Sequence, residues 1–347
     1  MTNLVKQLHE WTDIQAEFSN AALLIGNGGS RAIWEDFKYQ SLFTKAKKLK
    51  TSRRLDAADQ KVFAELGASE DFELVLSQLA TASRVCEIFE QSDAVIGEIH
   101  ERYQKIREAL LHAISDVHLR WSDDLRARLR AINNCYRSAK AVFTLNYDFL
   151  WYWALMEDSR RLTDFFNGSQ KFDRDYGEQC VLNGRIPVLY LHGALQLYQD
   201  LDGEPRKLKR RDDQDLLTIL LLNRAQHKWR VPLFVSEGSA EQKEKAIGRS
   251  NYLLFAWEQF RDWDGPVVVF GCSLDDRDKH LRKILQSKQR DIAISIRESD
   301  PQEINKRMVL YLDGLKSVTD NVCFYRASSH VLGDASMKMP SPAPLGR

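Results

Sequence analysis

The sequence predicts an α/β protein with a Rossmann-like, mostly parallel, doubly wound sheet and a helical insertion after the first strand. Short runs of strand-forming residues alternate with segments of helical periodicity, which is typical of parallel sheets. Four of these runs end in short polar or glycine-containing segments, at residues 26–30, 144–148, 191–193 and 271–274. The carboxyl ends of parallel strands meet at one edge of a sheet, so we expect these segments to form a ligand-binding crevice there.

The expected strands are short and mostly apolar, as strands buried on both faces are. In chain order they are residues 21–25, 141–143, 188–190, 231–235, 267–270, 292–296 and 322–325. Helical patterns separate the last of them, at residues 279–285 and 303–315. This alternation predicts crossover connections and a parallel sheet.

Residues 46–137 are predicted to be mostly helical and to interrupt one nucleotide-binding domain formed by residues 1–45 and 138–335. Ser69 is the expected N-cap of the first helix in this insertion, and Ser122 begins the third. The inward positions of the three helices are Phe72, Val75, Leu76 and Leu79; Ile99, Tyr103, Ile106, Leu110, Ile114 and Val117; and Leu125, Leu129, Ile132 and Tyr136. We expect residues 336–347 to form a flexible tail.

The composition is that of an ordinary soluble protein. Among 347 residues, 44% are hydrophobic and 29% are charged, and the net charge of +1 does not indicate a nucleic-acid or membrane partner. The five cysteines contain no Cys-x-x-Cys pair, which favours reduced thiols and a cytoplasmic location. We expect neither a signal peptide nor a membrane span, since the aliphatic cluster at residues 216–222 is far too short.

The first polar segment reads Gly-Asn-Gly-Gly-Ser. Gly26, Gly28 and Gly29 would let the backbone approach a pyrophosphate, with amides of the following helix as donors. Arg31 stands where the dehydrogenase fingerprint has a third glycine, so hydride transfer is not indicated. A tight structural turn is the alternative interpretation.

Asn146 and Asp148 follow the second strand at alternate positions. A neutral amide such as Asn146 can position water or a sugar hydroxyl without titrating, whereas the alternative is that Asn146 caps the next helix and Asp148 lies at its positive end. His192 ends another apolar strand and could act as a general base or hold a ribose hydroxyl; a buried structural histidine is the alternative.

In the fourth segment, Gly271 and Ser273 could contact a ribose or a phosphate, while Cys272 is better explained as a small buried residue than as a nucleophile. The aspartates that follow favour a solvated helix start over a metal site, so no metal is predicted. Solvated loops are also the favoured interpretation of the basic runs at residues 45–54 and 206–211.

Taken in order, the four segments resemble the motifs that surround NAD in the sirtuin fold, and especially in the sirtuin-like NAD hydrolases of bacterial anti-phage defence. Those motifs are a Gly-Ala-Gly-x-Ser loop, a Thr-Gln-Asn-x-Asp loop, a His-Gly pair and a Gly-Thr-Ser-Leu turn. Residues 36–38, Asp-Phe-Lys, are similar to the Asp-Phe-Arg of the loop that covers nicotinamide. Together with residues 232–238, the segments are closer still to an uncharacterised bacterial family related to these proteins.

The resemblance implies roles for individual residues. Asn146 and His192 would be catalytic, at the nicotinamide riboside of NAD. Asp148 would lie near the nicotinamide amide and Ser273 near the adenosine ribose. The full set implied to bind NAD is Gly26, Asn27, Gly28, Ser30, Asp36, Phe37, Asp148, Gly271 and Ser273.

The activity implied is hydrolysis of NAD to nicotinamide and ADP-ribose by an NAD-depleting effector of abortive infection. Such an enzyme needs restraint, so we expect a homo-oligomer or a complex with a partner defence protein. Protein deacylation is disfavoured, because the zinc module of sirtuin deacylases is missing and Leu145 replaces the expected glutamine. The alternative is a catalytically silent sensor that binds NAD or ADP-ribose.

Overall fold

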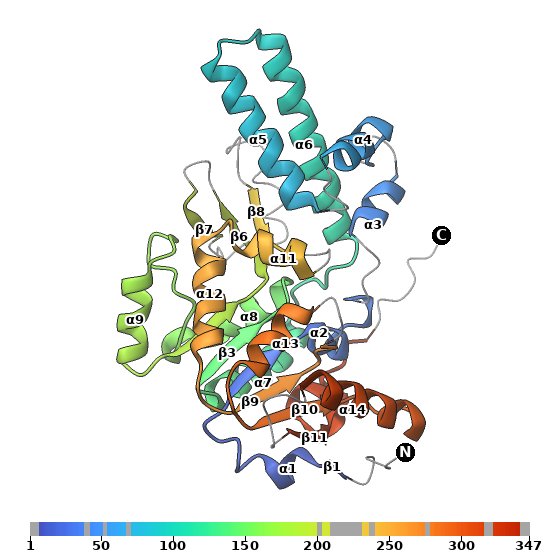
Figure 1. Ribbon diagram of the computed structural model, residues 1–347, viewed down its shortest axis with the longest axis vertical. Coiled ribbons are helices and arrows are strands. Elements are labelled where there is room, and N and C mark those ends of the chain that lie inside the picture. Colours follow the sequence, from blue (N-terminus) through green and yellow to red (C-terminus); the bar gives the residue numbers. More distant parts are fainter. Residues whose placement is uncertain are drawn as a thin grey trace.

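The computed structural model describes residues 7–37, 42–50, 54–66, 71–199, 203–208, 231–235, 240–274, 278–315 and 322–340. Within these residues the main sheet has eight strands, all parallel (Figure 1). In spatial order they are β1 (Leu8–His9), β11 (Val322–Arg326), β10 (Ile292–Ile296), β9 (Val267–Phe270), β2 (Ala22–Ile25), β3 (Ala141–Thr144), β5 (Ile186–Tyr190) and β4 (Leu162–Thr163). The predicted fold class is therefore confirmed.

The direction of winding reverses at β2. The chain leaves β2 toward β3 and β5, and it later returns to place β9 on the other side of β2, followed by β10 and β11. Right-handed crossovers put the connecting helices of the two halves on opposite faces of the sheet. The carboxyl ends of β2 and β9 consequently flank the topological switch point, where open α/β sheets bind ligands.

Helices cover both faces of the sheet. On one side α7 packs on α8 and on β5; on the other, α12, α13 and α14 follow one another over β5 to β10. All residues of α8 from Phe149 to Leu155 are buried, as expected for a helix that is apolar on every side. The helices outside the insertion are α1 (Trp11–Ile14), α2 (Asn27–Ile33), α8 (Phe149–Glu157), α9 (Arg174–Leu182), α11 (Ala240–Ile247), α12 (Asn251–Asp262), α13 (Lys279–Gln286) and α14 (Pro301–Leu315).

The insertion is helical, and its two longest helices form a hairpin that extends away from the sheet (Figure 1). Its helices are α3 (Leu42–Lys48), α4 (Ala57–Glu65), α5 (Phe72–Ile88), α6 (Asp93–Ser115) and α7 (Asp123–Ser138). Ser122 caps α7 as predicted, since its hydroxyl accepts from the Leu125 amide. Asp71, and not the predicted Ser69, caps α5, because its carboxylate accepts from the Leu74 amide at 2.9 Å.

A second sheet was not predicted. It is antiparallel, in the order β7 (Pro205–Lys207), β6 (Gly193–Gln199) and β8 (Val231–Phe234). The expected strand at residues 231–235 is thus a strand, but it belongs to this small sheet and contacts α5 of the insertion. β6 begins directly after His192 and β8 ends directly before Val235, so the small sheet lies next to the crevice.

Short 3-10 helices follow the last strand: η6 (Ala327–Ser329), η7 (Val331–Gly333) and η8 (Ala335–Met337). Two others are η2 (Glu35–Phe37) and η4 (Ser159–Arg161). Met337 and Met339 are buried, and the Met339 amide donates to the Ile33 carbonyl at 2.8 Å. The chain therefore stays packed to residue 339, further than the sequence predicted. Among the described residues, no helix is long and apolar enough to span a membrane.

Candidate functional site

A cavity of about 1150 Å³ lies across the carboxyl ends of the central strands. Residues that follow β3, β2, β9 and β10 line it, as does His192 after β5. Seven of the predicted site residues are among the lining: Gly26, Asn27, Gly28, Asn146, His192, Gly271 and Ser273. The crevice expected at this edge of the sheet is thus present at the topological switch point.

The glycines let two turns touch at the centre of the cavity. The Gly26 amide donates to the Phe270 carbonyl and the Gly28 amide to the Gly271 carbonyl, each at 2.8 Å. A Cβ on Gly28 would lie 2.6 Å from the Gly271 Cα, and Gly271 itself has a φ of +68°. Because no side chain fits between these turns, bare backbone faces the cavity there.

Asn146 places an unpaired acceptor in the cavity wall. Its Nδ2 donates to the Gly26 carbonyl at 2.9 Å, and its backbone amide donates to Thr144 Oγ1 at 3.1 Å. These contacts fix the amide so that Oδ1 is buried and has no hydrogen-bond partner within the described residues. An orphaned acceptor at this depth suits a water molecule or a ligand hydroxyl.

His192 forms a buried pair with His280 on α13, their Nε2 atoms 3.2 Å apart. One ring must donate and the other accept, and among the described residues no hydrogen bond is made by Nδ1 of His192. Burial lowers the pKa of His192 well below its ordinary value, with Lys243 and His280 acting in the same direction. The pKa of His280 is lowered to about 4, chiefly by burial. The pair is therefore uncharged at neutral pH.

Neighbouring side chains hold this pair in place. Trp257 packs against both imidazole rings, with centroid separations of 5.9 Å to His192 and 5.0 Å to His280. Its indole N–H donates to the Leu191 carbonyl at 2.6 Å. Lys243, which lines the cavity nearby, forms an ion pair with Asp278 at 3.0 Å. Rotation of either imidazole would disturb its contact with Trp257 and the bond between the two rings.

Two predicted ligand-binding residues, Ser30 and Asp148, lie behind the cavity wall and do not line it. The Ser30 hydroxyl donates to Asp148 Oδ2 at 2.6 Å and accepts from Trp151 Nε1 at 2.8 Å. Asp148 also caps α8 through the Leu150 amide. Burial raises the pKa of Asp148 to about 6, although these hydrogen bonds act in the opposite direction. The network links α2 to α8 beneath the glycine-rich turn.

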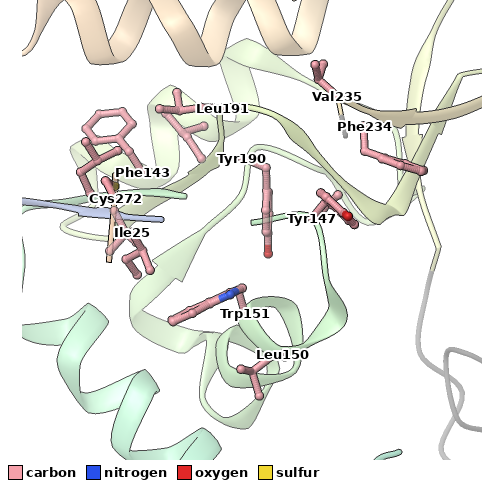
Figure 2. Close-up of a cluster of buried hydrophobic side chains, with 14 of the residues drawn as sticks. Ile25, Phe143, Tyr147, Leu150, Trp151, Tyr190, Leu191, Phe234, Val235 and Cys272 are labelled. Atoms are coloured by element: carbon pink, nitrogen blue, oxygen red, sulfur yellow. The ribbon is translucent and has the colours of Figure 1, made fainter. Parts of the chain in front are cut away.

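Aromatic side chains complete this floor. Figure 2 shows Tyr147, Tyr190 and Trp151 gathered around the start of α8, with Phe234 beside Tyr147. The rings of Tyr147 and Phe234 stack at a centroid distance of 5.1 Å. This packing joins β8 of the small sheet to the loop that carries Asn146.

The remaining predicted residues lie at the margin of the site. Asn27 donates to the Phe37 carbonyl at 3.3 Å, and Phe37 is buried in η2 and does not line the cavity. The side chain of Asp36, the predicted residue that precedes Phe37, lies outside what the structure describes. Cys272 lines the cavity, but burial raises its pKa well above the ordinary value, so the thiol stays protonated and is no nucleophile.

Sequence reasoning missed several residues of the site. Lys243 and Arg307 reach the cavity from α11 and α14, and Arg297 reaches it from the end of β10. His280 on α13 does not line the cavity but contacts His192, which does. None of them belongs to a motif, so only the tertiary fold identifies them. Within the described part of the chain, no group of three or more His, Cys, Asp or Glu side chains could hold a metal ion.

The fold and the cavity define a Rossmann-like α/β protein with a cavity at its topological switch point. The chain belongs to the family described as Domain of unknown function (DUF4917), whose model matches residues 23–331. No curated protein matches the sequence.

Two solved structures align over most of the chain at low identity. One, titled "Structural Basis for the Mechanism and Regulation of Sir2 Enzymes", is 14% identical with a TM-score of 0.35 and covers 93% of each chain. The other, a mutant Sir2 homologue in complex with ADP-ribose, is 12% identical with a TM-score of 0.33; the alignment covers 91% of this chain and 88% of that one.

Proposed function

We propose that the cavity binds NAD and that the protein hydrolyses it to nicotinamide and ADP-ribose. The observation that carries the proposal is the placement of Asn146 and His192. Thr144 of β3 pairs with Tyr190 of β5, and each of the two polar residues lies two positions beyond this pair. An open amide oxygen and a neutral imidazole therefore meet at one end of a cavity whose middle is bare glycine backbone.

An extended dinucleotide suits the order of these features. From β3 to β10 the cavity crosses three strand spacings, about 14 Å in all. With nicotinamide riboside at Asn146 and His192, the pyrophosphate falls on the turns of Gly28 and Gly271. The adenosine then extends toward β10, which places Ser273 near its ribose.

In the proposed reaction, water attacks C1 of the nicotinamide ribose. The N-glycosidic bond breaks, its electron pair returns to the ring nitrogen, and the attacking water loses a proton to solvent. Nicotinamide leaves as a neutral molecule from a cationic ring, so no strong acid is needed. Asn146 Oδ1 would orient the water and His192 Nδ1 would bind a ribose hydroxyl, which makes positioning the main source of the rate gain.

Nicotinamide release from NAD by the purified protein tests the proposal. Asn146→Ala and His192→Ala should each lower turnover at least a hundredfold while the far-ultraviolet circular dichroism stays unchanged. Asn134→Ala and His100→Ala remove the same residue types outside the cavity and should leave turnover unaltered. Full activity of both cavity variants would refute the assignment.

A binding module that senses NAD or ADP-ribose is the second candidate. Its support is the neutrality of the Asn146–His192 end: Asp148 is engaged behind the wall, and the histidine pair is uncharged. Neutral groups can hold a nucleotide without moving a proton. The same assay separates the candidates, because the module would bind ADP-ribose by calorimetry and release no nicotinamide under any condition.

We propose that the protein acts in the cell as an NAD-depleting effector of anti-phage defence. Self-association or a partner defence protein would restrain it. The tip of the α5–α6 hairpin offers a contact surface, since Ile88 and Phe89 are 68% and 71% exposed there and Val85 and Val95 flank them. Exposed apolar side chains gathered at one point are typical of interaction sites. Phe89→Ser should shift the sedimentation profile to smaller species; an unchanged profile would exclude a role of this tip in self-association.

A further inference from the structure

The β10 end of the cavity carries arginines that have no acidic partner among the described residues. In this part of the chain, nine charged side chains line the cavity: Arg31, Lys243, Arg297, Arg307, Lys338, Glu35, Asp278, Glu298 and Asp334. Arg31 faces Glu35 at 3.8 Å and Lys243 pairs with Asp278 at 3.0 Å. Both of these pairs involve cations from α2 and α11, outside the β10 end.

The other two acids are held by serines. Glu298 accepts hydrogen bonds from the amide and the hydroxyl of Ser328. Asp334 accepts from the amide of Ser336 at 2.8 Å and from its hydroxyl. Neither acid forms an ion pair within the part of the chain that the structure describes, and each keeps its negative charge, so at this end three lining cations face two lining acids.

Arg297, Arg307 and Lys338 are therefore the lining cations that make no ion pair among the described residues. They come from three elements: Arg297 directly follows β10, Arg307 lies on α14 and Lys338 follows η8. Solvation is the ordinary state of an isolated surface arginine. Arg297 and Lys338 are exposed and Arg307 is partly buried, so water reaches all three. Cations from separate elements that line one cavity also raise its attraction for an anion.

The position of these three cations relative to the rest of the site indicates which anion they would bind. The Gly271 amide donates to Ser295 Oγ of β10 at 3.0 Å, so the central turn and the β10 end are directly joined. Tyr311, buried on α14, donates its hydroxyl to the Cys272 carbonyl at 3.2 Å and lines the same end. On the NAD orientation proposed above, this is where the adenosine lies.

We propose that the preferred substrate carries a further phosphate on its adenosine ribose, as NADP does, and that Arg297 and Arg307 determine this specificity. The inference rests on the proposed function and on its orientation of the dinucleotide. A guanidinium matches a phosphate with parallel, charge-assisted hydrogen bonds, which ribose hydroxyls cannot replace. In dinucleotide-binding folds a nearby arginine can accommodate a 2′-phosphate.

Titration calorimetry with ADP-ribose and with 2′-phospho-ADP-ribose measures the preference without turnover. The wild-type protein should bind the phosphorylated ligand at least tenfold more tightly. Arg297→Gln and Arg307→Gln should each abolish most of this ratio and leave the affinity for ADP-ribose within twofold. Arg160→Gln, which changes an exposed arginine outside the cavity, should alter neither affinity.

The outcomes separate this inference from the proposed function. Equal affinity for the two ligands, or an equal loss for both in Arg297→Gln, overturns the specificity and leaves nucleotide binding standing. Binding of neither ligand overturns both. Nicotinamide release from NADP at a higher kcat/KM than from NAD, reversed in the arginine variants, supports both.

Discussion

Replacing Gly271 by alanine tests whether contact between the two glycine turns builds the site. Gly271 has a φ of +68°, a conformation that costs a residue with a Cβ about 1–2 kcal/mol. The new Cβ would also lie 2.5 Å from the Gly29 nitrogen and 2.7 Å from the Gly28 carbonyl carbon. The strain and the overlap act on the same hydrogen-bonded contact, so they should be relieved by separating the turns.

The magnitude follows from these distances. The Cβ would sit about 0.9 Å inside ordinary van der Waals contact, and overpacking of this kind costs about 1–3 kcal/mol. A shift large enough to relieve it would break the 2.8 Å bond from the Gly28 amide to the Gly271 carbonyl. We expect a total loss of roughly 2–5 kcal/mol in the free energy of unfolding.

Gly184→Ala is the matched control, because Gly184 has a φ of +83° and no atom within 4 Å of its added Cβ. It incurs the backbone strain alone. Urea denaturation and ADP-ribose calorimetry of both variants give the answer: Gly271→Ala should be destabilised further than Gly184→Ala and lose ligand binding. If the two variants lose equal stability and Gly271→Ala binds normally, the turn contact does not shape the site.

Two other buried groups give stability predictions. His118 Nε2 accepts a hydrogen bond from the Phe149 amide at 2.9 Å, and burial lowers the pKa of His118 to about 4. Because unfolded histidine titrates near 6.5, the free energy of unfolding should fall by about 3 kcal/mol as the pH drops from 6.5 to 4. Denaturation across this pH range should show a smaller fall in His118→Gln. Lys207→Met leaves Asp164, its buried partner at 2.6 Å, uncompensated and should cost about 3–5 kcal/mol in urea, whereas Arg174→Met at an exposed pair should cost under about 1 kcal/mol.

The central strands could be predicted because they are buried on both faces. Residues 267–270 are a continuous apolar run, residues 292–296 are apolar except for Ser295, and β9 and β10 have those bounds. The cap of α7 was predictable for a local reason, since Ser122 precedes two acidic residues and an amphipathic run. Signals that need only nearby residues were sufficient for these elements.

The small sheet could not be predicted in the same way. β6 pairs with β7 and β8, and β8 lies more than thirty residues further along the chain. A strand whose partners are non-local has no turn signal to identify them, and residues 231–235 are apolar enough for either sheet. The position of His280 beside His192 likewise depends on how α13 packs, and its sequence gives only an amphipathic helix.

The two ends of the cavity differ in charge, and so do the two ends of the proposed substrate. The nicotinamide ring of an oxidised dinucleotide is cationic, and an imidazolium beside it would repel it. Burial keeps His192 neutral, and the pair with His280 uses Nε2, so the ring that meets the cation carries no charge. Arg297 and Arg307, which make no ion pair among the described residues, lie at the opposite end, where the proposed orientation would put the anionic part of the ligand. A His280 variant that raised the pKa of His192 should therefore weaken binding of the oxidised dinucleotide more than binding of ADP-ribose, because ADP-ribose lacks the cationic ring. Equal weakening of both ligands would mean that His280 only supports the packing.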